Sequence, residues 1–140
     1  HFNLANFMRS HLYASFGALK VGMDLLLQQE KVEIDAIYGH GGIFKTKGVA
    51  QNYLAAALNT PVSVMETAGE GGPWGMALLT AYLVHKAEGE SLADYLEHHV
   101  FAGAVGTSVD PDPKDVEGFE AYANRFKNAI AVEQAAVDKL

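Results

Sequence analysis

Apolar residues near the N-terminus recur at spacings of three and four positions, which is the period of one face of an α-helix. Asn3 is a suitable N-cap, so the pattern predicts a helix from about Leu4 to Gln29. Gly17 and Gly22 lie inside it, and we interpret them as points where a neighbouring element packs closely. The predicted core face of this helix consists of Leu4, Phe7, Met8, Leu12, Phe16, Leu19, Met23 and Leu27.

After the first helix the pattern changes to a short strand-like run, residues 32–38. Nearly all residues after Asp35 in this run are apolar, which is typical of a strand buried on both faces. A helical pattern follows from about Gly48 to Asn59, with Asn59 as C-cap, and Pro61 blocks its continuation. Val62 to Met65 read as a second strand. The order strand, helix, strand predicts a βαβ unit with parallel strands.

The second half of the chain is predicted to be mainly helical. A glycine-rich turn covers residues 66–72, and a helix runs from Pro73 to about Lys86. Residues 91–94 resemble a capping box that opens a short helix ending near Phe101. A loop is predicted for residues 103–113, and Asp112 caps a last helix. The apolar stripe of that helix is Val116, Phe119, Tyr122, Phe126 and Ile130.

The predicted fold class is α/β, with short parallel strands covered by several long helices. Two strands do not make a stable sheet alone, so we expect further strands upstream, in a longer parent protein. The alternative is a small helical domain with a two-stranded patch. On the first interpretation residues 1–140 are part of one domain, with a βαβ core at about 32–87 and a helical extension at about 91–140.

Composition and charge narrow the functional classes. The chain has 140 residues, of which 49% are hydrophobic and 19% charged, so it can fill a core. A net charge of −7 argues against nucleic acid as a partner. Neither a membrane-spanning apolar run nor a signal-peptide pattern is present, and there is no cysteine. We therefore expect a cytoplasmic protein that is not bound to a membrane.

The two glycine-rich turns are the strongest candidates for a binding site. Each follows a predicted strand and precedes a predicted helix, so both should lie at the carboxyl edge of the sheet, where α/β proteins bind ligands. Glycine lets a ligand approach the main chain, and a helix N-terminus favours phosphate. The dinucleotide fingerprint is not met, because Phe44 and Trp74 stand where its third glycine belongs, and no P-loop motif occurs. Glycine can also serve such turns for steric reasons only.

Five side chains around these turns have both a structural and a functional interpretation. Lys45 and Lys47 either are solvated or offset phosphate charge, and Thr46 either caps the next helix or donates to a phosphate. Phe44 either plugs the core or stacks on a base. Glu66, after the second strand, can bind a ribose, although the motif expected with that role is absent.

The sequence offers little for catalysis or metal binding. None of the six histidines has a metal-ligand spacing, and no serine lies in a nucleophile elbow. His40, inside the first turn, is interpreted as a residue that holds the turn. We therefore predict no catalytic residue and no metal ligand in this chain.

The order of several short motifs resembles a known family. Residues 34–38 are followed by Gly41-Gly42, by Gln51, by residues 58–62 and by residues 75–79. This succession over about residues 4–87 resembles the C-terminal domain of the FGGY carbohydrate kinases, which have the actin-like, ribonuclease-H-like ATPase fold. The tail around Pro113 and residues 119–122 resembles the closing helices of the ribulokinase and xylulokinase branches.

The resemblance implies a set of roles. Gly41 and Gly42 would hold the adenosine and α-phosphate side of ATP, and Ile43 and Phe44 would line the adenine side. Thr46 falls where some members place an Asn that touches the nucleotide. Mg²⁺ would be held through the ATP phosphates. The catalytic aspartate and the sugar pocket should lie upstream, so the chain alone should be inactive.

The sequence and its family resemblance leave three hypotheses for the function of this chain. The leading hypothesis is the ATP-binding C-terminal portion of a kinase that phosphorylates a ketopentose. The second is a non-catalytic interaction or regulatory domain that kept this fold. The third is another βαβ nucleotide enzyme, such as a dehydrogenase, against which the missing glycine fingerprint counts. Exposed strand edges would favour self-association, for example as a homodimer.

Overall fold

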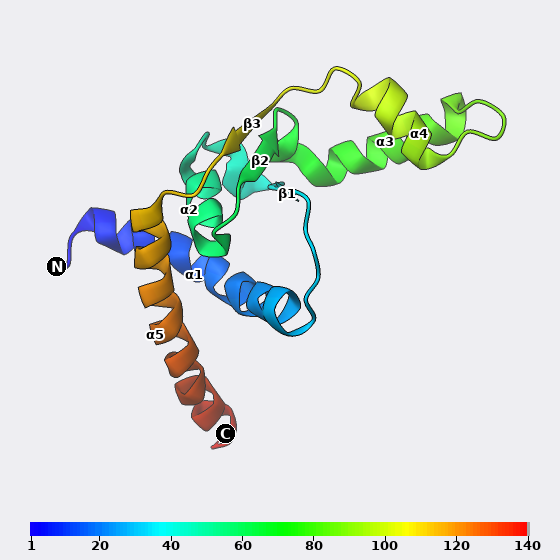
Figure 1. Cartoon of the computed structure of the whole chain (residues 1–140). Helices are drawn as coiled ribbons and strands as arrows, with labels where there is room; N and C mark the ends of the chain where they lie inside the picture. Colours follow the sequence, from blue (N-terminus) through cyan, green and yellow to red (C-terminus); the bar gives the residue numbers. More distant parts are fainter. Residues whose placement is uncertain (140) are drawn as a thin grey trace.

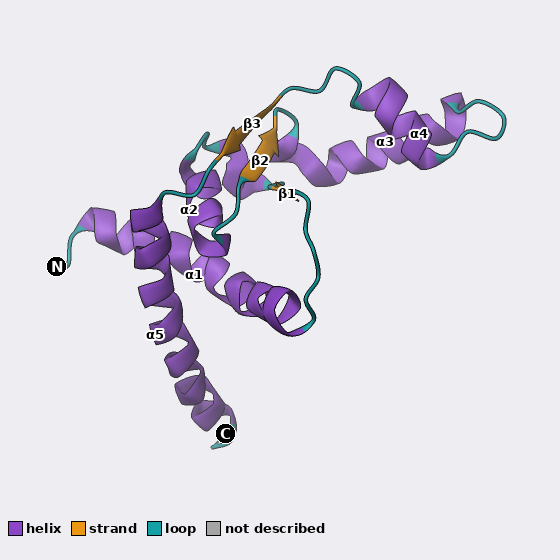
Figure 2. Cartoon of the chain, viewed as in Figure 1, coloured by secondary structure: helices purple, strands orange, loops and turns teal. Residues whose placement is uncertain are grey.

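A small mixed sheet forms the centre of the molecule, and helices flank it (Figure 1). The computed structural model describes residues 1–139. Strands β1 (Ile37–Tyr38), β2 (Val62–Met65) and β3 (Gly106–Val109) lie in the order β1-β2-β3. β1 pairs with β2 in parallel, and β3 pairs with β2 antiparallel. The predicted parallel βαβ unit is therefore confirmed within a fold that is mostly helical, as Figure 2 shows.

Two strand predictions were wrong. β1 has only two residues, and Tyr38 is 58% exposed, so this strand is not buried on both faces. Within residues 1–139 only β2 pairs with β1, which leaves its outer edge without a neighbour. β3 lies where a loop was predicted, and it forms because four of its residues pair with β2. The sheet thus has three strands instead of the two that the sequence indicated.

The first helix, α1 (Leu4–Asp24), continues into one wider helical turn, η1 (Leu25–Gln29). Asn3 caps it as predicted, with its side-chain oxygen accepting from the Asn6 amide at 2.7 Å. Gly17 is a packing glycine, because an added Cβ would lie 3.0 Å from the Phe126 ring. Gly22 faces open space instead. Much of the predicted core face is exposed, and of that face only Phe16 is buried.

Helix α2 (Val49–Leu58) is the best-buried element and connects the sheet to the other helices. It contacts β2 on one side and both α1 and α5 (Pro113–Val137) on another. Asn59 ends the helix in the left-handed conformation, at φ 48°, as its C-cap role predicts. The core around α2 consists of Tyr13, Phe16, Ala50, Leu54, Ala55, Ala57, Leu58, Val62, Phe119 and Ala123.

Helix α5 begins as predicted, with Asp112 accepting from the Lys114 amide at 2.8 Å and Pro113 in the first turn. An ion pair also joins α5 to α1. Asp24 accepts from Lys20 at 2.6 Å and from Lys127 at 3.0 Å. Burial alone would raise the pKa of Asp24, but the hydrogen bonds and charges of the two lysines outweigh it and lower that pKa.

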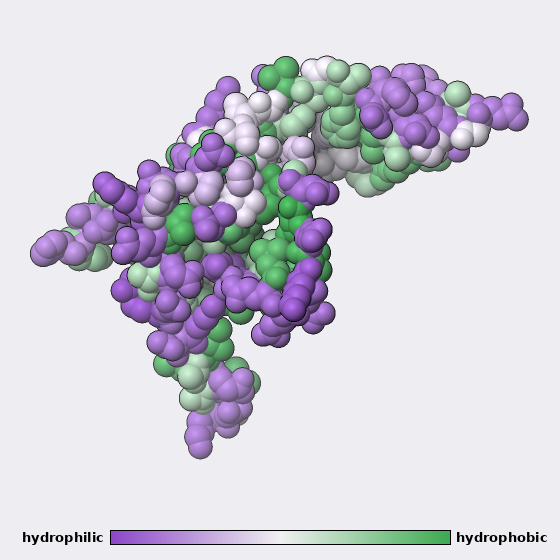
Figure 3. All heavy atoms as spheres, viewed as in Figure 1, coloured by the Kyte–Doolittle hydropathy of each residue, from purple (hydrophilic) through white to green (hydrophobic). Residues whose placement is uncertain are grey.

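Helix α3 (Gly71–His85) and the short α4 (Leu92–Tyr95), which continues into η4 (Leu96–Val100), form an arm that projects from the body (Figure 1). Ser91 caps α4 as predicted, accepting from the Asp94 amide at 3.1 Å. No residue of α3 is buried. Figure 3 shows apolar surface along this arm. Within residues 1–139 no helix has the length and apolar character needed to cross a membrane.

Candidate functional site

The two glycine-rich turns meet at one edge of the sheet, as the sequence predicted. Because β1 and β2 are parallel, the segments that follow them leave the sheet on the same side. The first segment contains the short helix η2 (Gly42–Lys45), and the second contains η3 (Ala68–Glu70). The Gly41 amide donates to the Ala68 carbonyl at 2.7 Å, which joins the two turns directly.

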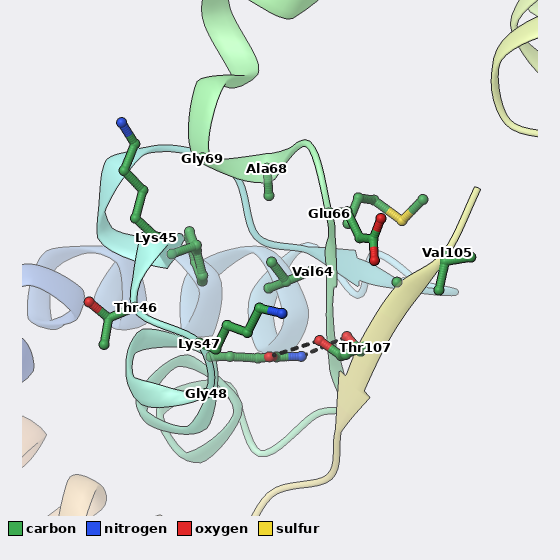
Figure 4. A pocket seen from close by; sticks show the side chains of 14 residues that line it. Lys45, Thr46, Lys47, Gly48, Val64, Glu66, Ala68, Gly69, Val105 and Thr107 are labelled. Carbon is green, nitrogen blue, oxygen red and sulfur yellow. Dashed lines mark hydrogen bonds between the residues drawn. The ribbon is translucent and has the colours of Figure 1, made fainter.

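A cavity of about 280 Å³ lies between these turns, α2 and β3 (Figure 4). Its size is near the lower limit for small-molecule sites. The walls come from three separate parts of the chain: residues 44–48 with Gln51, residues 64–69, and residues 105–107. Both apolar and polar groups line it. The apolar lining includes Phe44, Val64, Ala68 and Val105, and the polar lining includes Thr46, Lys47, Gln51, Glu66 and Thr107.

The predicted glycines lie beside this cavity without lining it. Gly41 has φ 109°, a left-handed value that favours glycine, and it begins η2. Added Cβ atoms at Gly41 and Gly42 would meet nothing within 4 Å. These two glycines are therefore not required for packing, and the space in front of them is open to a ligand. Gly39 differs, because its Cβ would lie 2.5 Å from the Phe44 ring.

The other three predicted residues occupy different positions. Phe44 lines the cavity and also packs against the core, so its two interpretations are compatible. Ile43 lies on η2, is 38% exposed and does not line the cavity. Thr46 lines the rim, and its side chain points away from Lys47 and Thr107 (Figure 4). Thr46 does not cap α2, because Gly48 occupies the N-cap position and no side chain caps that helix.

The charged residues around the cavity separate into a paired and an unpaired group. Lys45 forms an ion pair with Glu70 that joins η2 to η3, and both side chains are largely exposed. Lys47 and Glu66 line the cavity, and within residues 1–139 neither is in an ion pair. The Lys47 side chain extends toward Thr107 (Figure 4). The cavity thus offers one cation and one carboxylate to a ligand.

Sequence reasoning used Gln51 only as part of a family pattern, and the structure gives it a specific place. It is 4% exposed and lines the cavity. Its side-chain nitrogen donates to the carbonyls of Val62 at 2.8 Å and Thr107 at 2.7 Å. The position of Gln51 three and four residues before Leu54 and Ala55, on the apolar face of a helix, was the signal that could have indicated this buried polar role.

His40 lies outside this cavity, against the second turn. An added Cβ at Gly71 would lie 3.4 Å from the His40 side chain, so this exposed side chain lies beside the second turn. The predicted role of His40 in holding the turn fits this contact. Within residues 1–139 no group of three or more His, Asp or Glu side chains is arranged to hold a metal ion.

The fold is mixed α/β, and the cavity lies where the turns after two parallel strands meet, the edge at which open α/β sheets bind ligands. The model of the FGGY family of carbohydrate kinases, C-terminal domain, matches residues 1–84. The chain therefore belongs to the FGGY family of carbohydrate kinases. Comparison with curated proteins and with solved structures gives no match.

Proposed function

We propose that this chain is the ATP-binding C-terminal portion of a sugar kinase and that it holds the adenosine end of ATP in the cavity beside the first glycine turn. The observation that supports this most is the position of the cavity. It lies where the turns after two parallel strands meet, and most of its lining belongs to the stretch matched by the carbohydrate kinase family. Nucleotides bind at this edge in open α/β sheets.

The lining is suited to a nucleoside. Phe44, Val64 and Ala68 offer apolar contact for a base, and Lys47 and Glu66 offer a donor and an acceptor for its polar edge or for the ribose. In this proposal Ile43 and Thr46 contribute from the outer side of the same turn. The Gly41 amide already donates to Ala68, so the open space in front of Gly42 is the expected path of the α-phosphate.

The whole kinase would transfer the γ-phosphate of ATP to a hydroxyl of a sugar, and we propose a ketopentose. Members of the family use ATP with Mg²⁺, and in this proposal the ion would be held through the ATP phosphates. Phosphoryl transfer depends mainly on positioning and charge stabilisation. The catalytic aspartate would belong to another part of the kinase, and this chain alone would be inactive.

Helix α3 supports a role within a larger assembly. Met76, Leu79, Leu83 and Val84 are 45–71% exposed, although this helix is strongly apolar. Contiguous apolar surface of this kind normally packs against a neighbour. In the proposal that neighbour is the rest of the kinase. An aspartate placed as a general base upstream in the gene would favour this reading over a regulatory domain.

Calorimetry with ADP tests the nucleotide site. We expect the chain to bind ADP with a Kd of about 0.1–1 mM, because it provides only part of the site. Gly42→Val should weaken binding about tenfold or more, which corresponds to about 1.4 kcal/mol. The substitution itself fits the fold, since the new Cβ meets no atom within 4 Å.

Gly22→Val is the matched control, because Gly22 is also an exposed helical glycine with open space around it but lies on α1. It should leave ADP binding unchanged. Absence of heat with the unchanged chain up to millimolar ADP would count against the proposal. Equal affinities for the unchanged chain and Gly42→Val would reject the role of the first glycine turn.

A further inference from the structure

One wall of the cavity comes from a part of the chain that the family match does not reach. The match ends at residue 84, whereas Val105, Gly106 and Thr107 line the cavity. We propose that residues 105–107 form part of the nucleotide site and that Gln51 is the positioning residue that holds them there. This inference rests on the proposed function. It assigns one wall of the site to β3 and to Val105, which precedes that strand.

The side chain of Gln51 joins α2 to two neighbouring strands. A primary amide has two N–H donors, and here one goes to the Val62 carbonyl of β2 and the other to the Thr107 carbonyl of β3. The Thr107 hydroxyl also lies 3.4 Å from the Gln51 oxygen, as donor. The dashed lines in Figure 4 show the contacts with Thr107. Every polar atom of this buried side chain therefore has a partner.

β3 depends on such an anchor because, besides it, the strand is held mainly by its pairing with β2. It is an edge strand of four residues, and Gly106, Thr107 and Ser108 are exposed. Burial of apolar side chains therefore contributes little to its position. Apart from Gln51, the ladder with β2 holds it, and the Glu66 amide extends that ladder by donating to the Val105 carbonyl at 3.3 Å.

Close approach of the strands also shapes this wall. An added Cβ at Gly106 would lie 2.9 Å from the Met65 sulfur and 3.2 Å from the Val64 carbonyl oxygen. Glycine at this position lets β3 lie against β2, so that Val105 and Thr107 reach the cavity on either side of it. If β3 moved away, the cavity would lose this side and become an open groove.

The consequence for binding follows from the geometry. A nucleoside held between residues 44–48 and 64–69 would keep its contacts with the family-matched stretch but lose the third wall. The main core would persist, because its buried residues lie on α1, α2, α5 and β2. Loss of the anchor should therefore reduce nucleotide affinity more than it reduces folding.

Two variants test this on the whole chain. Gln51→Met keeps the length of the side chain and removes its donors, and we expect ADP binding to weaken about tenfold. Val105→Ala removes apolar lining but none of the Gln51 hydrogen bonds, because these go to Val62 and Thr107, and we expect about threefold weaker binding. Asn52→Met is the matched control, an exposed amide on the next residue of α2, and it should bind ADP normally.

Amide hydrogen exchange distinguishes positioning from general destabilisation. In Gln51→Met, exchange should accelerate at the Glu66 amide, which bonds to Val105, and stay slow at the Gly39 amide, which bonds to Ser63 between β1 and β2. ADP affinity unchanged in Gln51→Met or in Val105→Ala would overturn the inference, as would equal acceleration at both amides. Absence of ADP binding by the unchanged chain would instead refute the proposed function, and this inference with it.

Discussion

Phe119→Ala tests whether the C-terminal helix is part of the same cooperative unit as the family-matched stretch. Phe119 lies on α5, beyond residue 84, and is 0% exposed. Its ring centroid lies 4.8 Å from that of Tyr13 on α1 and 5.8 Å from that of Tyr122. If α5 belongs to the core, removing the Phe119 ring should destabilise the whole molecule, including the family-matched stretch.

The magnitude follows from burial and ring contacts. Core Phe→Ala substitutions cost about 3–5 kcal/mol, and aromatic pairs contribute about 0.5–1.5 kcal/mol each. Tyr122 is only half-buried and can relax into the space, so we expect the lower end, about 3 kcal/mol. For a domain of this size the Tm should fall by about 10 °C.

Thermal and urea unfolding followed by circular dichroism measure this change. Ile130→Ala is the matched control, because Ile130 belongs to the same predicted stripe but is 47% exposed, and it should cost less than about 1 kcal/mol. Equal losses for the two variants would refute the assignment of Phe119 to the core. Two separate unfolding transitions in the unchanged chain would refute the single cooperative unit.

Three further predictions concern charge and packing. The pKa of Asp24 is lower in the folded state than its unfolded value of about 3.9. The Asp24 carboxylate therefore stabilises the fold at pH values above about 3.9, and this stabilisation is lost as the pH falls through the folded pKa. Urea unfolding at several pH values should show a smaller acid loss in Asp24→Asn, and an unchanged slope would contradict the ion pair. Gly39→Ala should cost about 1–3 kcal/mol, because the Phe44 ring must move, and a melting curve equal to that of the unchanged chain would disprove this contact. Lys45→Met should change stability by less than about 0.5 kcal/mol, since its pair with Glu70 is exposed, and a loss above about 1.5 kcal/mol in denaturant titration would show that the pair matters.

The elements with strong local signals were predictable from the sequence. Asn59 and Pro61 set the end of α2, and Asp112 with Pro113 set the start of α5, because caps and proline act on their own backbone. The meeting of the two turns was also predictable, since the two parallel strands of a βαβ unit end at the same edge of the sheet. β3 was missed because Gly106 to Val109 show no apolar alternation, and they become a strand only by pairing with β2.

The spacing of apolar residues identified which residues share one face of a helix, but it did not show whether another element packs against that face. Leu4 and Met8 share a face with Phe16, yet they are 75% and 54% exposed, whereas Phe16 is buried in the core. The site was predictable in the same partial way. The first turn and its candidate side chains, Lys47 among them, could be placed, whereas residues 105–107 reach the cavity through a strand pairing that no local pattern records.

Titration of the isotopically labelled chain with ADP, followed by amide chemical shifts, is the decisive test of nucleotide binding at this cavity. We expect shifts that saturate at millimolar ADP and concentrate at residues 44–48, 64–69 and 105–107 around the cavity. Shifts confined to the α3 arm, or no shifts at millimolar ADP, would contradict the assignment of a nucleotide site to this edge of the sheet.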